Sequence, residues 1–241
     1  MGATLNSDRF LQAFNRIEKH LRREAQEDRF VSFGKLVREA ERRDGIVRRY
    51  AVDLHELADL RNAIVHETTD GHVIAEPNDR TVWHIETIAA ALSEPPLVAP
   101  FIRDVMTVAD TSTIGEAVGL LKERNYSQLP VTKQGKFYAL LTSNTVARWL
   151  GAAADEVKLS TPVAEVLEHA EDDGAHVFID RNATQFDVLE AFERPLRTGK
   201  SLSALLITHS GKTHEKIVGI VTASDLPTVL QALELADSRR G

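Results

Sequence analysis

The sequence predicts an α+β fold, in which an N-terminal all-α helical bundle precedes two copies of one mixed helix-and-strand unit. Three observations lead to this prediction. Apolar residues recur every three or four positions through residues 5–95, short strand-like segments begin after "SEPPLVAPF", and the new order of elements then repeats. At 241 residues, 43% of them hydrophobic, the chain is long enough for two ordinary domains.

The first part of the chain contains four segments with helical periodicity. They are "LNSDRFLQAFNRIEKHLRREAQ", a second segment around "FGKLVREA", a third from about Ile46 to His66, and "TVWHIETIAAALSEP". The Asp44-Gly45 pair is expected to end the second helix, and "TTDGHVIAEPNDR" to form a loop. These segments predict a small antiparallel bundle over residues 1–96.

The second part, residues 97–241, repeats the order helix, strand pair, helix. "STIGEAVGLLKERN", "SQLPVTKQGKFYALLT" and "SNTVARWLG" form the first copy, at about 100–151. "TQFDVLEAFERPLRTG", "LSALLITHSGKTHEKIVGIVT" and "ASDLPTVLQALELA" form the second, at about 160–236. Thr142 and Thr222 hold equivalent places 80 residues apart, which fits two copies of one supersecondary unit.

Composition excludes several classes of protein. A net charge of −7 argues against a general DNA coat or a polybasic membrane binder. The absence of cysteine excludes disulfides, thiolate metal sites and cysteine nucleophiles. No apolar run reaches the roughly 18 residues of a membrane span, and the first ten residues lack the pattern of a secretion signal. We therefore expect a cytoplasmic protein with no membrane association and no bound metal.

Residues 100–235 resemble a tandem pair of CBS domains, the Bateman module. The resemblance is carried by "IRDVMTVADTSTIGEAVGLL" with "SQLPV" in the first copy and by "VGIVTASDL" in the second. It implies a β-α-β-β-α fold for each copy. It also implies a cleft between the paired sheets that holds a regulatory adenine nucleotide (AMP, ADP or ATP) or a related adenosyl ligand.

The segment "GIVTASD" supplies the candidate ligand-binding residues of the second copy. Gly219 leaves room for a close approach of backbone, the Thr222 hydroxyl can donate to a phosphate at the start of the next helix, and the Asp225 carboxylate can accept from ribose hydroxyls. The same spacing of Thr222 and Asp225 is nearly a helix-capping box, so a purely structural role stays open. Because the cleft of such pairs is shared, the candidate wall residues are Tyr126, Ser127, Ser203 and Ala204.

The first copy departs from this pattern. In its segment "ALLTSNT", Ala139 stands in place of the glycine and Thr145 in place of the ribose-binding acid, although Thr142 remains. We therefore expect one competent site, centred on Thr222 and Asp225, and one degenerate site.

The stretch "LRNAIVHE", residues 60–67, places polar groups on the third helix. On a helical wheel, Arg61 falls near the centre of an apolar stripe, and a buried guanidinium needs an anionic partner. A polar edge lies beside it. The stripe consists of Leu54, Leu57, Ala58, Ile64 and Val65, and the edge of His55, Asp59, Asn62 and His66.

Three interpretations of this stretch remain open. In the first, Arg61 pairs with a carboxylate of another helix and His66 only ends its own helix. In the second, His55, Asp59 and His66 bind a metal, although no established metal-ligand spacing supports this. In the third, Arg61 neutralises the phosphate of a phosphodiester while His66 transfers protons.

The third interpretation coincides with a second resemblance, because "RNAIVH" is similar to the signature of the HEPN superfamily. The resemblance implies that Arg61, Asn62 and His66 are catalytic residues of a metal-independent ribonuclease, although other members of the superfamily are not catalytic. Arg61 and His66 lie five residues apart, so a two-fold homodimer would be needed to assemble one site. The sequence thus predicts a homodimeric sensor–effector in which an adenosyl ligand controls an RNA-cutting domain. The alternative is a non-catalytic regulator.

Overall fold

The computed structural model describes residues 5–25, 31–66, 68–69, 72–73, 76–153, 156–170 and 176–238. The chain forms two compact units. The first contains residues 1–96, 185–187 and 228–241, and the second contains residues 97–184 and 188–227. The expected domain boundary between residues 96 and 97 stays a prediction. No helix in the described part of the chain is long and apolar enough to cross a membrane.

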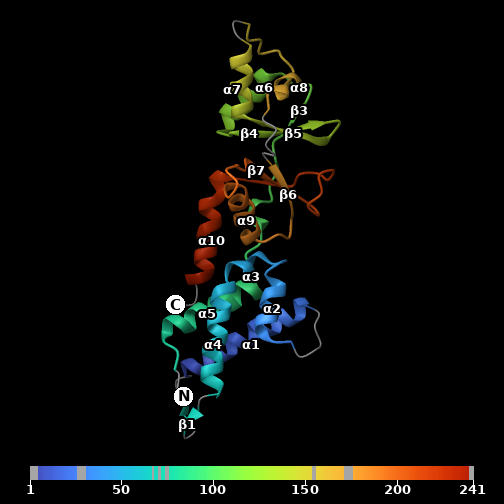
Figure 1. The fold of residues 1–241 in the computed structure, drawn as a ribbon. Helices are drawn as coiled ribbons and strands as arrows, with labels where there is room; N and C mark the ends of the chain where they lie inside the picture. The colour runs from blue at the N-terminus through green and yellow to red at the C-terminus, as the bar shows by residue number, and fades with distance from the viewer. Residues whose placement is uncertain are drawn as a thin grey trace. The chain divides into compact units, whose positions relative to one another are not determined.

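The first unit is a helical bundle, as the apolar periodicity predicted. Its helices are α1 (Asn6–Ala25), α2 (Phe33–Ala40), α3 (Gly45–Arg49), α4 (Ala51–His66) and α5 (Asp79–Ser93). α1 packs along α5, and α2 packs on α1 and α4 (Figure 1). The core lies between these helices and consists mainly of Phe10, Phe14, Ile17, Leu21, Leu36, Leu54, Ile64, Ile85 and Ile88.

Two details of this unit differ from the prediction. The third helix is not continuous, because Tyr50 leaves helical geometry (φ −103°, ψ 14°) and separates α3 from α4. The Tyr50 ring lies edge-on to His84, with 6.4 Å between the ring centroids. The segment expected to be a loop also contains a short hairpin, β1 (Thr68–Thr69) and β2 (His72–Val73).

The second unit contains two three-stranded sheets of the same topology. The first sheet is formed by β3 (Val108–Ala109), β4 (Gln128–Lys133) and β5 (Lys136–Thr142), and the second by β6 (His176–Asp180), β7 (Ala204–Thr208) and β8 (Gly219–Thr222). In each sheet the first pair of strands is parallel and the second pair antiparallel. This unit also contains η1 (Ala99–Phe101), α6 (Ile114–Arg124), α7 (Ser143–Ala152), α8 (Val163–Val166), η2 (Leu167–His169), η3 (Ala223–Asp225) and, from Val188 onward, α9 (Gln185–Leu196). The last helix, α10 (Leu226–Ser238), belongs to the first unit from Thr228 onward.

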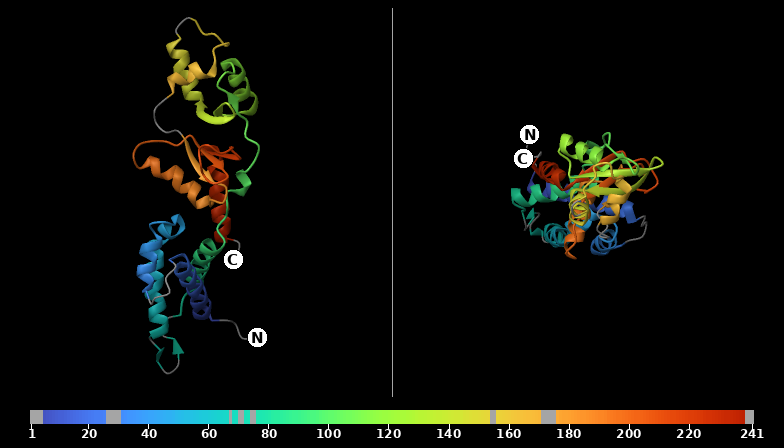
Figure 2. Two further views of the ribbon diagram at one scale, coloured as in Figure 1. Left: turned by 90° about the vertical axis from the view of Figure 1, so that its right-hand side faces the viewer. Right: turned by 90° about the horizontal axis from the view of Figure 1, so that it is seen from above.

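The two faces of the first sheet pack into two different cores. Leu129, Val131 and Leu141 pack with the helices α6, α7 and α8 in one core cluster. Leu140, the neighbour of Leu141 on β5, packs instead with Ala204 and Leu206 of β7 and with Ile217, which precedes β8. Successive side chains of a strand point to opposite faces, so β5 joins both cores. Figures 1 and 2 show the helices on the face of the first sheet that is turned away from the second sheet.

Gln134 and Gly135 form the turn between β4 and β5. Both residues have positive φ (51° and 75°), the conformation of a tight two-residue hairpin turn. The register then pairs Lys133 with Lys136 and brings Gln128 opposite Thr142. The register shifts by one residue between Val131 and Thr132, so the turn and this irregularity together set which residues of the first repeat face the second one.

Candidate functional site

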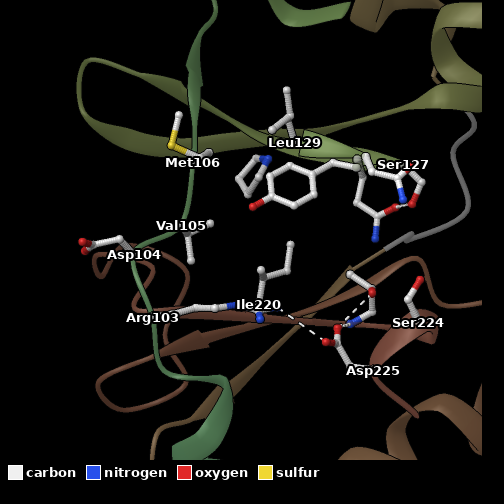
Figure 3. Close-up of a pocket in the computed structure, with 14 residues that line it drawn as sticks. Arg103, Asp104, Val105, Met106, Ser127, Leu129, Ile220, Ser224 and Asp225 are labelled. Atoms are coloured by element: carbon white, nitrogen blue, oxygen red, sulfur yellow. Dashed lines mark hydrogen bonds and ion pairs between the residues drawn. The ribbon is translucent and has the colours of Figure 1, made fainter. Parts of the chain in front are cut away.

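Three segments of the second unit enclose a cleft of about 200 Å³ (Figure 3). One segment connects η1 to β3, one follows the end of α6, and one joins β8 to η3. The cleft therefore draws on both repeats. Its lining consists of Arg103, Asp104, Val105, Met106, Asn125, Tyr126, Ser127, Gln128, Leu129, Pro130, Ile220, Thr222, Ser224 and Asp225.

A capping box formed by Thr222 and Asp225 at the start of η3 fixes the Asp225 carboxylate. Its Oδ2 accepts hydrogen bonds from the Thr222 backbone nitrogen (2.8 Å) and the Thr222 hydroxyl (3.0 Å). Its Oδ1 lies 3.5 Å from Nη2 of Arg103, and the Asp225 side chain is 20% exposed. The capping role considered from the sequence is therefore present. The cap does not use all the acceptor capacity of the carboxylate, because each oxygen carries two lone pairs.

The first repeat contributes the opposite wall, at the start of β4. Asn125 adopts the left-handed conformation (φ 53°) and ends α6 with its backbone nitrogen bonded to the carbonyls of Leu121 and Lys122. Asparagine tolerates this conformation better than most residues. The turn leaves Tyr126 47% exposed and places Ser127 beside it in the lining.

Polar and apolar groups occupy different parts of the cleft. Val105, Met106, Pro130 and Ile220 supply apolar surface, and Ile220 points from β8 into the cleft (Figure 3). Ser127, Thr222, Ser224 and Asp225 supply hydroxyl and carboxylate oxygens. An apolar surface beside a few fixed polar groups is the usual composition of a small-molecule site.

The seven predicted ligand-binding residues divide into two groups. Tyr126, Ser127, Thr222 and Asp225 line the cleft. The remaining three lie outside its lining, and each has a structural contact. Gly219 faces the Phe101 carbonyl, with which an added Cβ would clash. The Ser203 carbonyl accepts from Gln128 Nε2 at 2.9 Å, and Ala204 is fully buried between the sheets.

Arg103 and Asp104 are cleft residues that sequence reasoning missed. They stand immediately before the "VMT" that carried the resemblance, and Arg103 is anchored by its backbone nitrogen to the Val218 carbonyl (2.9 Å). Two charged residues next to an apolar segment could have identified them as candidate ligand-binding residues. The sequence did not say that this connecting segment runs along the edge of β8.

Arg61 is partly exposed rather than buried at the centre of an apolar stripe. Leu54, Leu57 and Ile64 are buried, while Val65 is 40% exposed and does not belong to the stripe. The Arg61 guanidinium lies over the Phe14 ring, with Cζ 5.9 Å from the ring centroid. Among the described residues, no carboxylate lies within 4.0 Å of it, so the predicted ion pair with another helix is not found there.

Arg61 and Asn62 line a cavity of about 490 Å³ in the helical bundle. Arg61 Nη1 donates to Asn62 Oδ1 at 3.3 Å. The other lining residues come from α1, α2, α4 and the residues before α2, and are Phe14, Glu18, Arg22, Val31, Ser32, Phe33, Gly34, His55, Ala58 and Asp59. His66 is the last residue of α4, and its side chain lies outside the described residues, so the predicted triad is not placed as a whole.

The metal interpretation of the polar edge finds no support in the described part of the chain. His55 and Asp59 both line the cavity. No group of three or more histidine, aspartate or glutamate side chains that could hold a metal ion is found among the described residues.

Comparison with known proteins identifies one domain. Residues 98–152, which include the elements from η1 to α7, match the CBS domain model. The second repeat lies beyond the matched range. No curated protein matches the chain.

Solved CBS-domain structures are similar to part of the chain. The CBS-domain containing protein ATU1752 from Agrobacterium tumefaciens is 20% identical, with a TM-score of 0.42, and the match covers 56% of this chain and 97% of that one. The CBS domain pair of MJ0100, solved with 5′-methylthioadenosine and S-adenosyl-L-methionine, is 18% identical, with a TM-score of 0.42 and coverage of 57% and 98%. CBSX2, solved with AMP, is 14% identical, with a TM-score of 0.42 and coverage of 58% and 98%.

Proposed function

We propose that the CBS domain at residues 98–152 and the repeat after it form a regulatory module that binds an adenosyl compound in the cleft around Asp225. The observation that carries this proposal is the fixed orientation of the Asp225 carboxylate. Thr222 holds one of its oxygens with two hydrogen bonds, while the side chain stays partly exposed in a cleft with an apolar side. A pre-oriented carboxylate next to apolar surface suits a ribose joined to a base.

Each side of the cleft would hold a different part of the ligand. The base would lie against the apolar side chains of Val105, Met106 and Ile220, because these provide surface without charge. The ribose hydroxyls would donate to Asp225, which can accept two hydrogen bonds. The 5′ group would then lie near Arg103, whose guanidinium can donate to an anion.

Thermal melts of the full chain test this function directly. A ligand that binds the folded protein raises the melting temperature in proportion to the logarithm of its excess over Kd. We expect adenosine, AMP or S-adenosylmethionine to raise the melting temperature and GMP at the same concentration to leave it unchanged. GMP is the matched control because it has the same ribose and phosphate as AMP. Absence of any shift with a panel of adenosyl compounds at millimolar concentration would contradict the proposal.

A second candidate function concerns the helical bundle. We propose that Arg61, Asn62 and His66 act on RNA in a homodimer, with the adenosyl-binding module as the regulator. The observation that favours this is that Arg61 lines a cavity without a carboxylate partner among the described residues, so its charge is available to a phosphate. The alternative is a non-catalytic module in which both units sense a ligand and dimerise.

Substitution of Arg61 separates these alternatives. Its described contacts are a ring contact with Phe14 and a hydrogen bond to the adjacent Asn62, so Arg61→Ala should cost only about 1 kcal/mol of unfolding free energy. If the bundle cuts RNA, Arg61→Ala and His66→Ala should abolish cleavage of mixed RNA at nearly unchanged stability. A loss of about 3–5 kcal/mol in Arg61→Ala would indicate a buried ion pair instead. Sedimentation at tens of micromolar checks the dimer, and a monomer would contradict the composite RNA site.

A further inference from the structure

Arg103 is the single positively charged residue among the fourteen that line the cleft. The lining also contains two carboxylates, Asp104 and Asp225, so its net charge is negative. An anionic ligand in this cleft would therefore be repelled by two groups and attracted by one. Phosphate binding in this cleft therefore depends on whether the Arg103 guanidinium can reach the phosphate.

The contact between Arg103 and Asp225 is weak by its geometry. The distance from Nη2 to Oδ1 is 3.5 Å, and the Arg103 side chain is 55% exposed. Exposed ion pairs of this kind contribute little stability because water screens them. Asp225 does not need Arg103 for its orientation, since Thr222 holds the other carboxylate oxygen from both its backbone nitrogen and its hydroxyl.

The backbone of Arg103 is fixed while its side chain has room to move. The backbone nitrogen donates to the Val218 carbonyl at 2.9 Å, and the preceding Ile102 forms a bridge to Gly219. Figure 3 shows the Arg103 side chain extending along the cleft toward Asp225, whereas Asp104 points away from Asp225. A guanidinium on an anchored backbone can exchange one partner for another without movement of the sheet.

We propose that Arg103 leaves Asp225 when ribose hydroxyls occupy that carboxylate, and then binds the 5′-phosphate of the same ligand. This inference rests on the proposed function of the cleft and specifies its ligand class as a nucleoside monophosphate. One guanidinium can bind one phosphate through two parallel hydrogen bonds. A triphosphate adds negative charge for which the lining has no second cation, while the Asp225 carboxylate stays in the cleft.

Titration calorimetry with adenosine, AMP and ATP, in buffer without divalent cations, tests the exchange. For the unmodified chain we expect AMP to bind more tightly than adenosine and about tenfold or more tightly than ATP. In Arg103→Met, AMP affinity should fall by about tenfold to a hundredfold, the range for a hydrogen bond between charged groups. Adenosine affinity should stay the same or rise slightly, because Asp225 has lost its competing partner.

Two further variants control for the loss of charge. Arg103→Lys keeps the charge but not the paired hydrogen bonds, so it should retain part of the preference for AMP. Arg124→Met removes a 52% exposed guanidinium at the end of α6, outside the cleft lining, and should change nothing.

Three other results of the calorimetry would contradict the proposal. Equal losses of adenosine and AMP affinity in Arg103→Met would overturn the exchange, because Arg103 would then only maintain the shape of the cleft. ATP binding as tightly as AMP to the unmodified chain would overturn the monophosphate class. If none of the three compounds bound the unmodified chain, the proposed function itself would fail, and this inference with it.

Discussion

Thr142 and Thr222 occupy equivalent places in the two repeats, yet their surroundings differ. In the first repeat the Thr142 hydroxyl accepts from the backbone nitrogen of Thr145 at 3.1 Å and lies 2.9 Å from the Thr145 hydroxyl, and Thr145 is only 3% exposed. In the second repeat the partner of Thr222 is the carboxylate of Asp225, which is partly exposed in a cleft. One local motif therefore caps a helix in both places and carries a charge at a cleft in only one.

The two threonine motifs indicate that helix capping and ligand binding depend on different properties of these residues. Both motifs satisfy a backbone nitrogen at the start of a helix, so a cap alone does not distinguish a ligand site from a structural motif. The distinguishing property is the partner three residues later. In the first repeat this partner is the neutral, buried hydroxyl of Thr145, whereas the partly exposed carboxylate of Asp225 retains acceptors for a ligand.

Substitutions of Gly219 and of its counterpart Ala139 should give the largest difference between the repeats. They test whether the backbone of another segment approaches only the second repeat at this position. A Cβ added at Gly219 would clash with the Phe101 carbonyl and contact Ile207 Cδ1 at 2.9 Å. Backbone cannot retreat as a flexible side chain can, so we expect Gly219→Ala to lower the free energy of unfolding by about 3 kcal/mol. Urea denaturation monitored by circular dichroism measures this change.

The matched control for Gly219→Ala is Ala139→Gly in the first repeat. It should cost only about 0.5–1 kcal/mol, the usual effect of glycine inside a strand. Similar losses in the two variants would mean that the close approach of Phe101 does not distinguish the repeats.

Substitutions of Asp225 test whether the two repeats differ in ligand binding. Asp225→Ala should weaken adenosyl binding by about 1.5–3 kcal/mol, because it removes a charged hydrogen-bond acceptor. Asp225→Thr gives the second repeat the residue of the first, so it should lose the same affinity while keeping a hydroxyl partner for Thr222. Calorimetry on both variants measures the effect.

Thr145→Ala is the control for the Asp225 variants and should leave adenosyl affinity unchanged. Equal effects at Thr145 and Asp225, or none at either, would remove the distinction between a competent and a degenerate site.

The first strands of the repeats differ in their response to pH. Val108 of β3 belongs to an apolar core, whereas His176 of β6 lies against Phe137 and Phe178, with ring centroids 4.9 Å and 5.7 Å away. Burial lowers the pKa of His176 below 6.5. The unfolded chain therefore takes up a proton more readily than the folded one. Stability is then full above pH 6.5 and falls as the pH decreases from 6.5 toward the lowered folded-state pKa.

The measurement is the difference in melting temperature between His176→Phe and the unmodified chain across pH 5–8. The variant should lose part of the pH dependence. It should keep the part due to His20, whose pKa burial also lowers. Parallel curves for the two proteins would contradict a role for His176.

The elements of the fold could be predicted from the sequence because their signals are local. The apolar spacing of α1 and the Gln134-Gly135 turn each depend on a few neighbouring residues. The strand pair of each repeat was predicted from the recurrence of segments, and β4–β5 and β7–β8 are antiparallel pairs. The first strand of each sheet, β3 or β6, was expected only from the resemblance to CBS domains. The break at Tyr50 was missed because it occurs inside an otherwise periodic segment.

The candidate site was predicted only in part, because its other contacts are distant in the sequence. Thr222 and Asp225 are neighbours in the chain, and their capping geometry follows from that spacing. Arg103 reaches Asp225 across 122 positions, and no local pattern predicts such a contact. The approach of Phe101 to Gly219 is equally non-local, so the glycine was assigned to the ligand rather than to the fold.

The connecting segment that passes Gly219 also covers the start of an outer strand. β8 is an outer strand of its sheet, and the unpaired backbone groups of an outer strand can bind a strand of another molecule. The bridge from Ile102 to Gly219 and the hydrogen bond from the Arg103 nitrogen to Val218 occupy this edge. A fragment that began after Arg103 would expose it, and we expect such a fragment to associate through β8 even if both of its sheets form.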